Sequence, residues 1–343
     1  MHYRSLGRTG IKVSPYALGA MNFGAMSNTD HDDSIRIVHA ALDAGINLID
    51  TADVYSLGES EEIVGKAIKA RRDNVVLATK FSNPMGGDDP NRRGGSRRWI
   101  LAAVENSLRR LQTDYIDLYQ YHYLDAASDL EETLAALTDL VQAGKVRAIG
   151  TSKFPAAEIV EAQWISERRG LQRFRSEQPT YSILNRAVER DVLPVAGRYG
   201  IGTIVYSPLA QGLLTGRVRK GRESELTRSG TYYAHLRDER RIDIVERLIP
   251  LADEFGMSLT HLAMAFAIAH PGVTSALLGP RTIEHLEDSL AGAEIELGDD
   301  ILDRIDEIVP PGTDVGHLQM SYNPPALVDP RLRRRPIEER TAA

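Results

Sequence analysis

The apolar positions of the chain recur as short runs that alternate with longer segments of helical period. The first runs cover residues 16–19, 48–50 and 75–80, and an amphipathic segment follows each one. Short apolar runs bounded by turn residues are typical of buried strands, whereas apolar positions three and four residues apart indicate a helix. Strand and helix are therefore predicted to alternate from residue 16 onward.

Strongly apolar strands that alternate with helices imply a parallel sheet covered by helices. Residues 3–14, turning at Arg8-Thr9-Gly10, predict a hairpin before the first strand. The predicted strands are 16–19, 48–50, 75–80, 116–121, 146–151, 176–179, 203–207 and 276–279. The predicted helices are 32–44, 60–71, 96–111 with Ser96 as its cap, 130–143, 155–167 beginning at Pro155, 188–199, 239–255, 259–270, 283–293 and 300–308.

Eight strand–helix units favour a closed (β/α)8 TIM barrel over an open, doubly wound sheet. The segment Gly19–Gly24 does not match the G-x-G-x-x-G fingerprint that an open dinucleotide-binding sheet would carry. We expect an α/β fold with an N-terminal β-hairpin and extra helices after strands seven and eight. One barrel domain would span residues 1–310, and a C-terminal tail, 311–343, would partly cover the active site.

The amino-acid composition excludes several classes of function and partner. The 343 residues carry 41 basic and 48 acidic side chains, a net charge of −7 that argues against nucleic acid or an anionic membrane as partner. The lack of cysteine excludes disulfides and thiolate chemistry. No apolar run approaches the roughly 20 residues of a membrane span, and Met1–Arg4 does not begin a signal peptide. We therefore expect a cytoplasmic protein that acts on a small molecule, in an oligomeric state left open.

Ionisable side chains stand where several predicted strands end. Asp50 ends the second strand, Lys80 ends the third, and His122 lies just past the fourth, while Tyr55 follows Asp50 in the loop. Barrel active sites gather at these C-terminal strand ends. A phenol with a pKa of about 10 is a weak acid, but a neighbouring ammonium favours the phenolate and lowers its pKa. Tyr55 would then be the general acid, tuned by Lys80 and Asp50, with His122 orienting the carbonyl.

Each of these residues also has an ordinary explanation when taken alone. Asp50 would cap a turn or pair with a lysine. Tyr55 would pack on the surface, and His122 would be a structural histidine. Lys80 would be structural, or would form the Schiff base of an aldolase. A proton-transfer site is nevertheless favoured, because the ordinary explanations would have to hold independently at four strand-end positions.

The motifs around these residues resemble those of the aldo-keto reductases. They are L-G-x-M-N-F-G at 18–24, D-T-A-D-x-Y at 50–55, S-E-E-x-V-G-K-A at 60–67 and Y-I-D-L-Y-Q-x-H at 115–122. The resemblance covers about residues 3–310 and points to the bacterial and potassium-channel β-subunit branches. It implies a catalytic tetrad of Asp50, Tyr55, Lys80 and His122. It also implies hydride transfer from NADPH, with NADH as the alternative, to an aldehyde or ketone such as a sugar or keto-sugar.

The same resemblance implies a cofactor site on the other half of the barrel. Ser152 and Gln178 would contact the nicotinamide carboxamide, Tyr206 would stack on the ring, and Arg281 would face a 2′-phosphate. Lys153 stands where the family pattern usually has asparagine, while His285 and Ser289 replace its glutamine and asparagine. The implied cofactor residues are Met21, Asp50, Ser152, Gln178, Tyr206, Ser207, Leu209, Gln211, Gly216, Gly279, Arg281, His285 and Ser289.

Several features allow two interpretations. Met21, Trp99 and Tyr123 are candidates for the substrate pocket, although Trp99 would serve equally well in helix packing. The segment 216–230 would be either a plain loop or a lid over the pyrophosphate. No H-E-x-x-H pattern is present, so no metal is expected. A regulatory, cofactor-holding subunit similar to channel β-subunits is the alternative to an enzyme.

Overall fold

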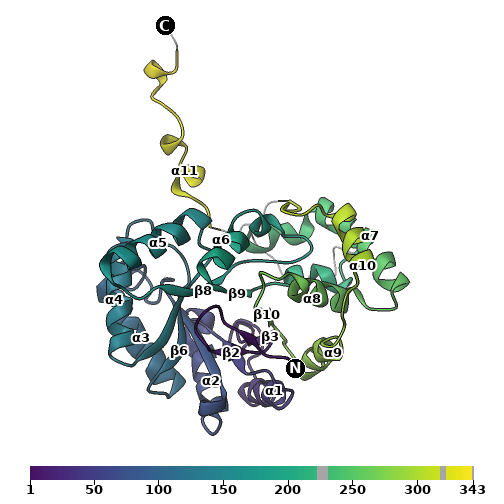
Figure 1. The fold of residues 1–343 in the computed structure, drawn as a ribbon, viewed down its shortest axis with the longest axis horizontal. Helices are drawn as coiled ribbons and strands as arrows, with labels where there is room; N and C mark the ends of the chain where they lie inside the picture. The colour runs from purple at the N-terminus through teal and green to yellow at the C-terminus, as the bar shows by residue number, and fades with distance from the viewer. Residues whose placement is uncertain (222–230, 317–321, 342–343) are drawn as a thin grey trace.

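The computed structural model describes residues 1–221, 231–316 and 322–341. At its centre is a closed barrel in the strand order β10-β3-β4-β5-β6-β7-β8-β9, and every neighbouring pair is parallel (Figure 1). The predicted (β/α)8 barrel is thus confirmed. The strands are β3 (Tyr16–Gly19), β4 (Leu48–Asp50), β5 (Val76–Phe81), β6 (Ile116–Tyr121), β7 (Val146–Ser152), β8 (Phe174–Gln178), β9 (Gly202–Val205) and β10 (Ser275–Leu278).

Helices surround this barrel (Figure 1). The predicted cap is confirmed, because the Ser96 side chain accepts a hydrogen bond from the Trp99 backbone N–H. The α-helices are α1 (His31–Asp43), α2 (Glu59–Ile68), α3 (Arg97–Leu111), α4 (Leu130–Gln142), α5 (Ala156–Arg169), α6 (Val192–Tyr199), α7 (Glu239–Glu254), α8 (Leu259–Ala269), α9 (Ile283–Ala291), α10 (Asp299–Ile308) and α11 (Pro325–Val328).

Several predicted boundaries differ from the observed ones, most clearly at three places. Pro155 caps helix α5 instead of forming its first residue. The predicted helix 188–199 is a short η3 turn (Ala187–Glu189) followed by α6, because the Asp191 side chain accepts from Val192 N and starts a new helix. Strand β9 ends at Val205, two residues earlier than expected.

An antiparallel hairpin of β1 (Arg4–Ser5) and β2 (Lys12–Val13) precedes the barrel, as predicted. Its Leu6 and Val13 are fully buried and cluster with inward-facing residues of the strands, including Ala17, Leu48 and Ala78. Because these partners lie at the start and middle of their strands, the hairpin packs against the N-terminal end of the barrel. The hairpin therefore does not cover the C-terminal end of the barrel, where the active sites of such barrels lie.

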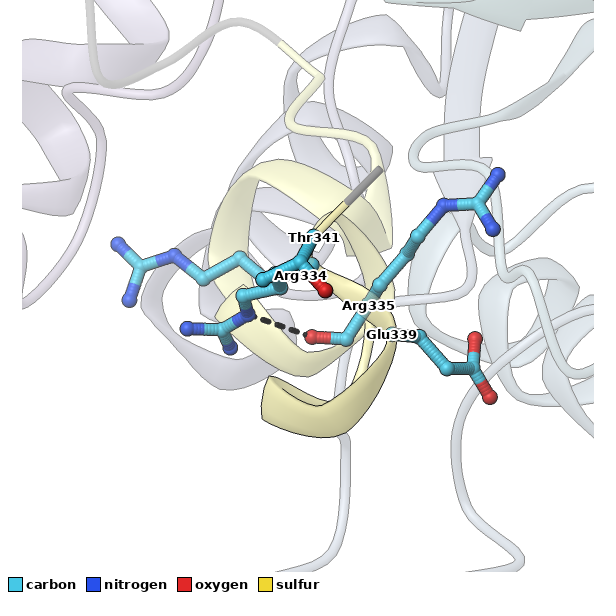
Figure 2. A pocket seen from close by; sticks show the side chains of 5 residues that line it. Arg334, Arg335, Glu339 and Thr341 are labelled. Atoms are coloured by element: carbon cyan, nitrogen blue, oxygen red, sulfur yellow. Dashed lines mark hydrogen bonds between the residues drawn. The ribbon is translucent and has the colours of Figure 1, made fainter. Parts of the chain in front are cut away.

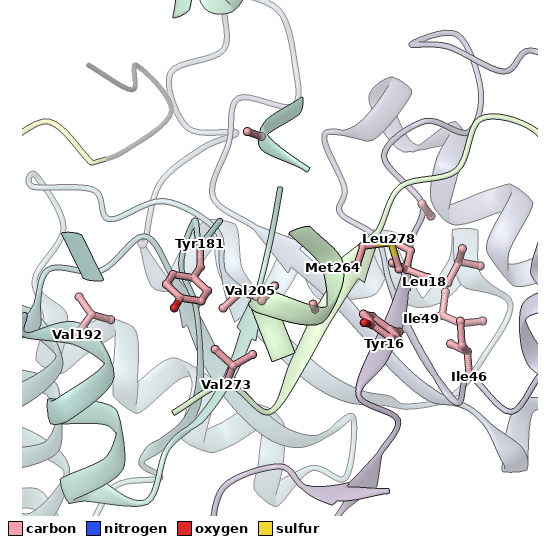
Figure 3. Close-up of a cluster of buried hydrophobic side chains, with 14 of the residues drawn as sticks. Tyr16, Leu18, Ile46, Ile49, Tyr181, Val192, Val205, Met264, Val273 and Leu278 are labelled. Carbon is pink, nitrogen blue, oxygen red and sulfur yellow. The ribbon is translucent and has the colours of Figure 1, made fainter. Parts of the chain in front are cut away.

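A second and larger apolar cluster lies between the strands and the helices. It includes Ile49 of β4, Val205 of β9 and Met264 of α8, and Figure 3 shows part of it. Trp99 is also buried in this cluster, which agrees with its interpretation as a helix packing residue. No helix of the described residues is long and apolar enough to cross a membrane.

The C-terminal residues leave the barrel after a contact beside the strand ends. The ring centroids of Tyr322 and Tyr123 lie 6.2 Å apart. The chain beyond α11 runs away from the barrel (Figure 1). A hollow within this outer part is lined by Arg334, Arg335, Glu339, Arg340 and Thr341 (Figure 2). It contains none of the predicted site residues. Two statements stay predictions: that a separate tail begins at residue 311, and that this tail partly covers the active site.

Candidate active site

The inward-facing residues change from apolar to polar toward the C-terminal end of the barrel. Leu48 and Ala78 belong to the interior apolar cluster, and two residues further along their strands come Asp50 and Lys80. Alternate residues of a strand share a face, so both charged side chains point inward. Lys80 is also the register partner of Gln120 on β6. The folded barrel therefore builds a polar layer on top of an apolar one.

The Lys80 ammonium is the centre of this layer. Its side chain is fully buried and forms an ion pair with Asp50 Oδ1. It also donates to the Thr51 carbonyl oxygen at 2.8 Å and to the Tyr55 hydroxyl at 3.3 Å. These three acceptors match the three N–H bonds of an ammonium. Burial lowers the pKa of Lys80, and the charge of Asp50 opposes that shift.

Asp50 links Lys80 to two side-chain amides. Its Oδ2 accepts from Gln120 Nε2 and from Gln178 Nε2, each at 2.9 Å. Gln178 Nε2 also lies 3.2 Å from Gln120 Oε1. A buried carboxylate needs such partners, because an unpaired charge in the interior is very costly. Asp50 is thus held from β6 and β8 as well as from Lys80.

The loop after β4 places Tyr55 against Lys80 through an unusual backbone turn. Ser56, Leu57 and Gly58 all have a positive φ, of 49°, 55° and 103°. Such angles are unfavourable for serine and leucine. Ser56 is stabilised there, because its Oγ donates to the Phe23 carbonyl oxygen at 3.0 Å and accepts from the Met26 backbone N–H at 3.0 Å. Backbone strain of this kind is often found at functional sites.

The pKa of Tyr55 departs from the prediction. Burial, followed by the negative charges of Asp50 and Asp53, raises the pKa of Tyr55 well above its usual value. We expected Lys80 to lower it. The prediction was wrong because burial disfavours the phenolate, and the Asp50 carboxylate that holds Lys80 opposes it further. In this state the phenol keeps its proton at neutral pH.

His122 lies beside Tyr55, and the two rings meet edge to face with centroids 5.7 Å apart. Burial and the positive charges of Lys153 and Lys80 lower the pKa of His122 well below its usual value, so the imidazole is neutral. Its Nδ1 lies 2.9 Å from Asn83 Nδ2. With that amide as donor, Nδ1 is the acceptor and Nε2 carries the proton. Tyr55 and His122 then offer two O–H or N–H donors at one place.

The implied nicotinamide residues lie on the opposite strands. Ser152 and Gln178 are register partners at the ends of β7 and β8. Ser152 Oγ donates to the Gln178 carbonyl oxygen at 2.9 Å, while the Gln178 amide nitrogen is bonded to Asp50. These bonds leave Gln178 Oε1 and the lone pairs of Ser152 Oγ as acceptors. Tyr206 follows β9 and lies 5.7 Å, measured to its ring centroid, from Lys153 Nζ.

The other implied cofactor residues occupy the loops after β3, β9 and β10. Ser207 and Gln211 have φ angles of 58°, in a tight loop that precedes Gly216. The Gly279 carbonyl oxygen accepts from Asn22 Nδ2 at 2.7 Å, next to Met21. The remaining positions are Leu209 within the β9 loop, Arg281 just before α9, and His285 and Ser289 within α9, where Ser289 Oγ donates to the His285 carbonyl oxygen at 2.8 Å. Of the segment 216–230, interpreted from the sequence as either a plain loop or a lid, residues 222–230 lie outside the described part of the chain.

Sequence reasoning missed several polar residues around the tetrad. Gln120 lies on β6 two residues before His122, and Asn83 follows Lys80 by three residues. Their proximity in sequence to predicted site residues was the available signal. Asp53 is buried, and neither carboxylate oxygen has a hydrogen-bond partner among the described residues. Burial, followed by the charge of Glu61, raises the pKa of Asp53 well above its usual value.

The barrel and the acid–base group at its C-terminal end define the class of protein, a TIM-barrel enzyme. The sequence model of the aldo/keto reductase family matches residues 16–310. The chain belongs to this family, and it is an oxidoreductase.

Three relatives illustrate the range of that similarity. The chain is 40% identical to the uncharacterized oxidoreductase YrpG of Bacillus subtilis, over 90% of this chain and 96% of the relative. It is 40% identical to the aldo-keto reductase YhdN of the same organism, over 84% and 87%. A probable voltage-gated potassium channel subunit beta of Arabidopsis thaliana is 34% identical, over 90% and 97%.

Proposed function

We propose that this protein is an NADPH-dependent reductase of aldehydes or ketones, with Tyr55 as the general acid. The observation that carries the proposal is the buried chain of contacts from Asp50 to Lys80 to the Tyr55 hydroxyl. Lys80 donates to the phenol oxygen, so the phenol's own hydrogen points elsewhere. That hydrogen is available to an acceptor outside the protein, such as a carbonyl oxygen.

Tyr55 and His122 would act on the same oxygen. The neutral imidazole donates through Nε2 and orients the carbonyl, while the phenol transfers its proton as negative charge develops. The phenolate left behind lies 3.3 Å from Lys80 Nζ, which stabilises it. Asp50 keeps that ammonium charged and in place.

The residues at the ends of β7 and β8 fit a nicotinamide cofactor. Gln178 Oε1 and Ser152 Oγ are acceptors side by side, which is the chemistry that a carboxamide –NH2 requires. A bound reduced nicotinamide supplies the hydride. The protein's part is to orient the carbonyl, to supply the proton and to hold the cofactor.

Two arginines near the start of α9 favour a cofactor with a 2′-phosphate. After burial, the positive charges of Arg217 and Arg281 lower the pKa of His285, so both guanidinium groups lie close to this helix. The N–H groups at a helix N-terminus and arginine side chains both bind phosphate. NADPH is therefore proposed in preference to NADH.

The test is Tyr55→Phe, assayed by aldehyde-dependent loss of nicotinamide absorbance with NADPH and NADH in parallel. Removal of the proton donor should lower kcat by about 10²–10⁴-fold and leave cofactor binding unchanged. Tyr115→Phe is a matched control, because Tyr115 immediately precedes β6 at the other end of the barrel. Full turnover by Tyr55→Phe would disprove the assignment of the general acid.

A regulatory subunit is the second candidate, because several relatives bear the name of a channel β-subunit. Tight cofactor retention without turnover across a carbonyl panel that includes a nitrobenzaldehyde would support it. An aldolase is less compatible with the site, since Lys80 is fully buried and its three N–H bonds are engaged. Borohydride trapping of a substrate adduct on Lys80 would nevertheless establish that activity.

A further inference from the structure

Lys153 is a second lysine at the C-terminal end of the barrel, and the tetrad does not use it. It directly follows Ser152, the last residue of β7, and its φ of 61° is unusual for a residue with a side chain. Its backbone N–H donates to the Gln178 carbonyl oxygen at 3.2 Å. A left-handed lysine persists only when its surroundings hold it there. The contacts of Lys153 at the end of the barrel therefore hold its backbone in this conformation.

Aromatic rings surround the Lys153 ammonium in place of a carboxylate. Nζ lies 5.1 Å from the ring centroid of Tyr123 and 5.7 Å from that of Tyr206. Both distances are within the range of a cation–π interaction. Tyr123 is in turn packed against Tyr322. Within the described residues, no carboxylate lies within ion-pair distance of Lys153.

The charges facing Lys153 leave its positive charge only partly compensated. Lys80 on β5 is paired with Asp50, and His122 after β6 is neutral. Glu177 on β8 is the nearby acid, but burial raises its pKa to about 7, so it is only partly ionised at neutral pH. Burial and Lys80 lower the pKa of Lys153 to about 8, which keeps most of its charge at pH 7.

We propose that Lys153 makes the site prefer the reduced to the oxidised nicotinamide cofactor, and so favours carbonyl reduction over alcohol oxidation. The inference rests on the proposed function. All three residues assigned to the nicotinamide adjoin Lys153: Ser152 by a peptide bond, Gln178 by a hydrogen bond and Tyr206 by its ring. The oxidised ring carries a positive charge and the reduced ring is neutral. An ammonium beside them repels only the oxidised form.

The test compares the dissociation constants of NADP⁺ and NADPH by isothermal titration calorimetry. In the wild-type protein at pH 7, NADPH should bind about tenfold more tightly than NADP⁺ through this charge. Lys153→Met should tighten NADP⁺ binding and reduce that ratio toward one. Lys153→Arg is the matched control, because it keeps a long, charged side chain and should keep the ratio.

Measurements at pH 7 and pH 9 add a second readout. Deprotonation of Lys153 as the pH rises through about 8 should tighten NADP⁺ binding in the wild type and leave NADPH binding little changed. Neither variant should show this change, since methionine is never charged and arginine stays charged. A ratio in Lys153→Met equal to that of the wild type would overturn the inference but not the proposed function. Failure of the wild type to bind either form would overturn both.

Discussion

The two sides of the barrel opening each place a lysine near a buried carboxyl group, with different results. On the β4–β5 side, Lys80 is bonded directly to Asp50 and to the Tyr55 hydroxyl. On the β7–β8 side, Glu177 accepts instead from the Thr151 hydroxyl and the Phe154 backbone N–H, while Lys153 lies against aromatic rings. The same residue types thus form an ion pair on one side and remain separate on the other.

This difference shows that the function of a buried lysine depends on its partners. Lys80 is held by three acceptors, so it can fix a phenol and stabilise the phenolate. Lys153 lies against aromatic rings and has no comparable set of acceptors among the described residues, so its charge acts on a ligand bound beside Tyr206. The most direct way to examine this division is to remove each charged group separately.

The largest effect is expected from Lys80→Met. Loss of the ammonium removes the group that stabilises the Tyr55 phenolate, so kcat should fall about 10²–10⁴-fold in the coupled carbonyl-reduction assay. Lys145→Met is the control, because Lys145 pairs with Glu105 at the partly exposed start of β7. If Lys153 were able to replace Lys80, the variant would keep near-normal turnover, and the two lysines would not be distinct.

Glu177→Gln should change how stability depends on pH. The folded protein raises the pKa of Glu177 from 4.5 to about 7, so it binds this proton more tightly than the unfolded chain does. The free energy of unfolding therefore falls as pH rises from about 4.5 to about 7, by up to about 3 kcal/mol for this group. Urea unfolding at pH 5 and pH 8 should show a smaller decrease in the variant. Equal decreases in both proteins would show that Glu177 is not the group responsible.

The smallest effect is expected from Asp53→Asn. Asp50 and Asp53 are both buried, but Asp50 is paired, whereas burial raises the pKa of Asp53 well above its usual value. Asparagine resembles the neutral carboxyl, so at about pH 3, where this carboxyl is largely protonated in the folded and the unfolded chain, the free energy of unfolding should change by less than about 1 kcal/mol. The stability of the variant relative to the wild type should increase as the pH rises above about 4, because the unfolded wild-type chain then releases the Asp53 proton while the folded protein retains it. A loss of several kcal/mol at pH 7 would show instead that Asp53 is ionised and paired.

The barrel was predictable because its signals are local. Residues 16–19, 48–50 and 116–121 matched the observed strands without change, since short apolar runs bounded by turns leave few alternatives. The helix starting after Ser96 was also predictable from its cap. The split of the segment 188–199 was not, because it depends on which polar side chain captures the free N–H groups of a helix.

The positions of Asp50, Lys80 and His122 at strand ends, with Tyr55 beyond Asp50, determined that these residues would meet at one end of the barrel. Only the tertiary structure decided which other side chains these residues contact and how their pKa values shift. Register between distant strands brought Gln120 and Gln178 to Asp50, and burial raised the pKa of Tyr55. Lys153, a substituted position in the sequence, became a charge facing the site through its left-handed backbone and two aromatic neighbours. Strand periodicity is encoded locally, whereas pKa shifts depend on distances and burial that exist only after folding.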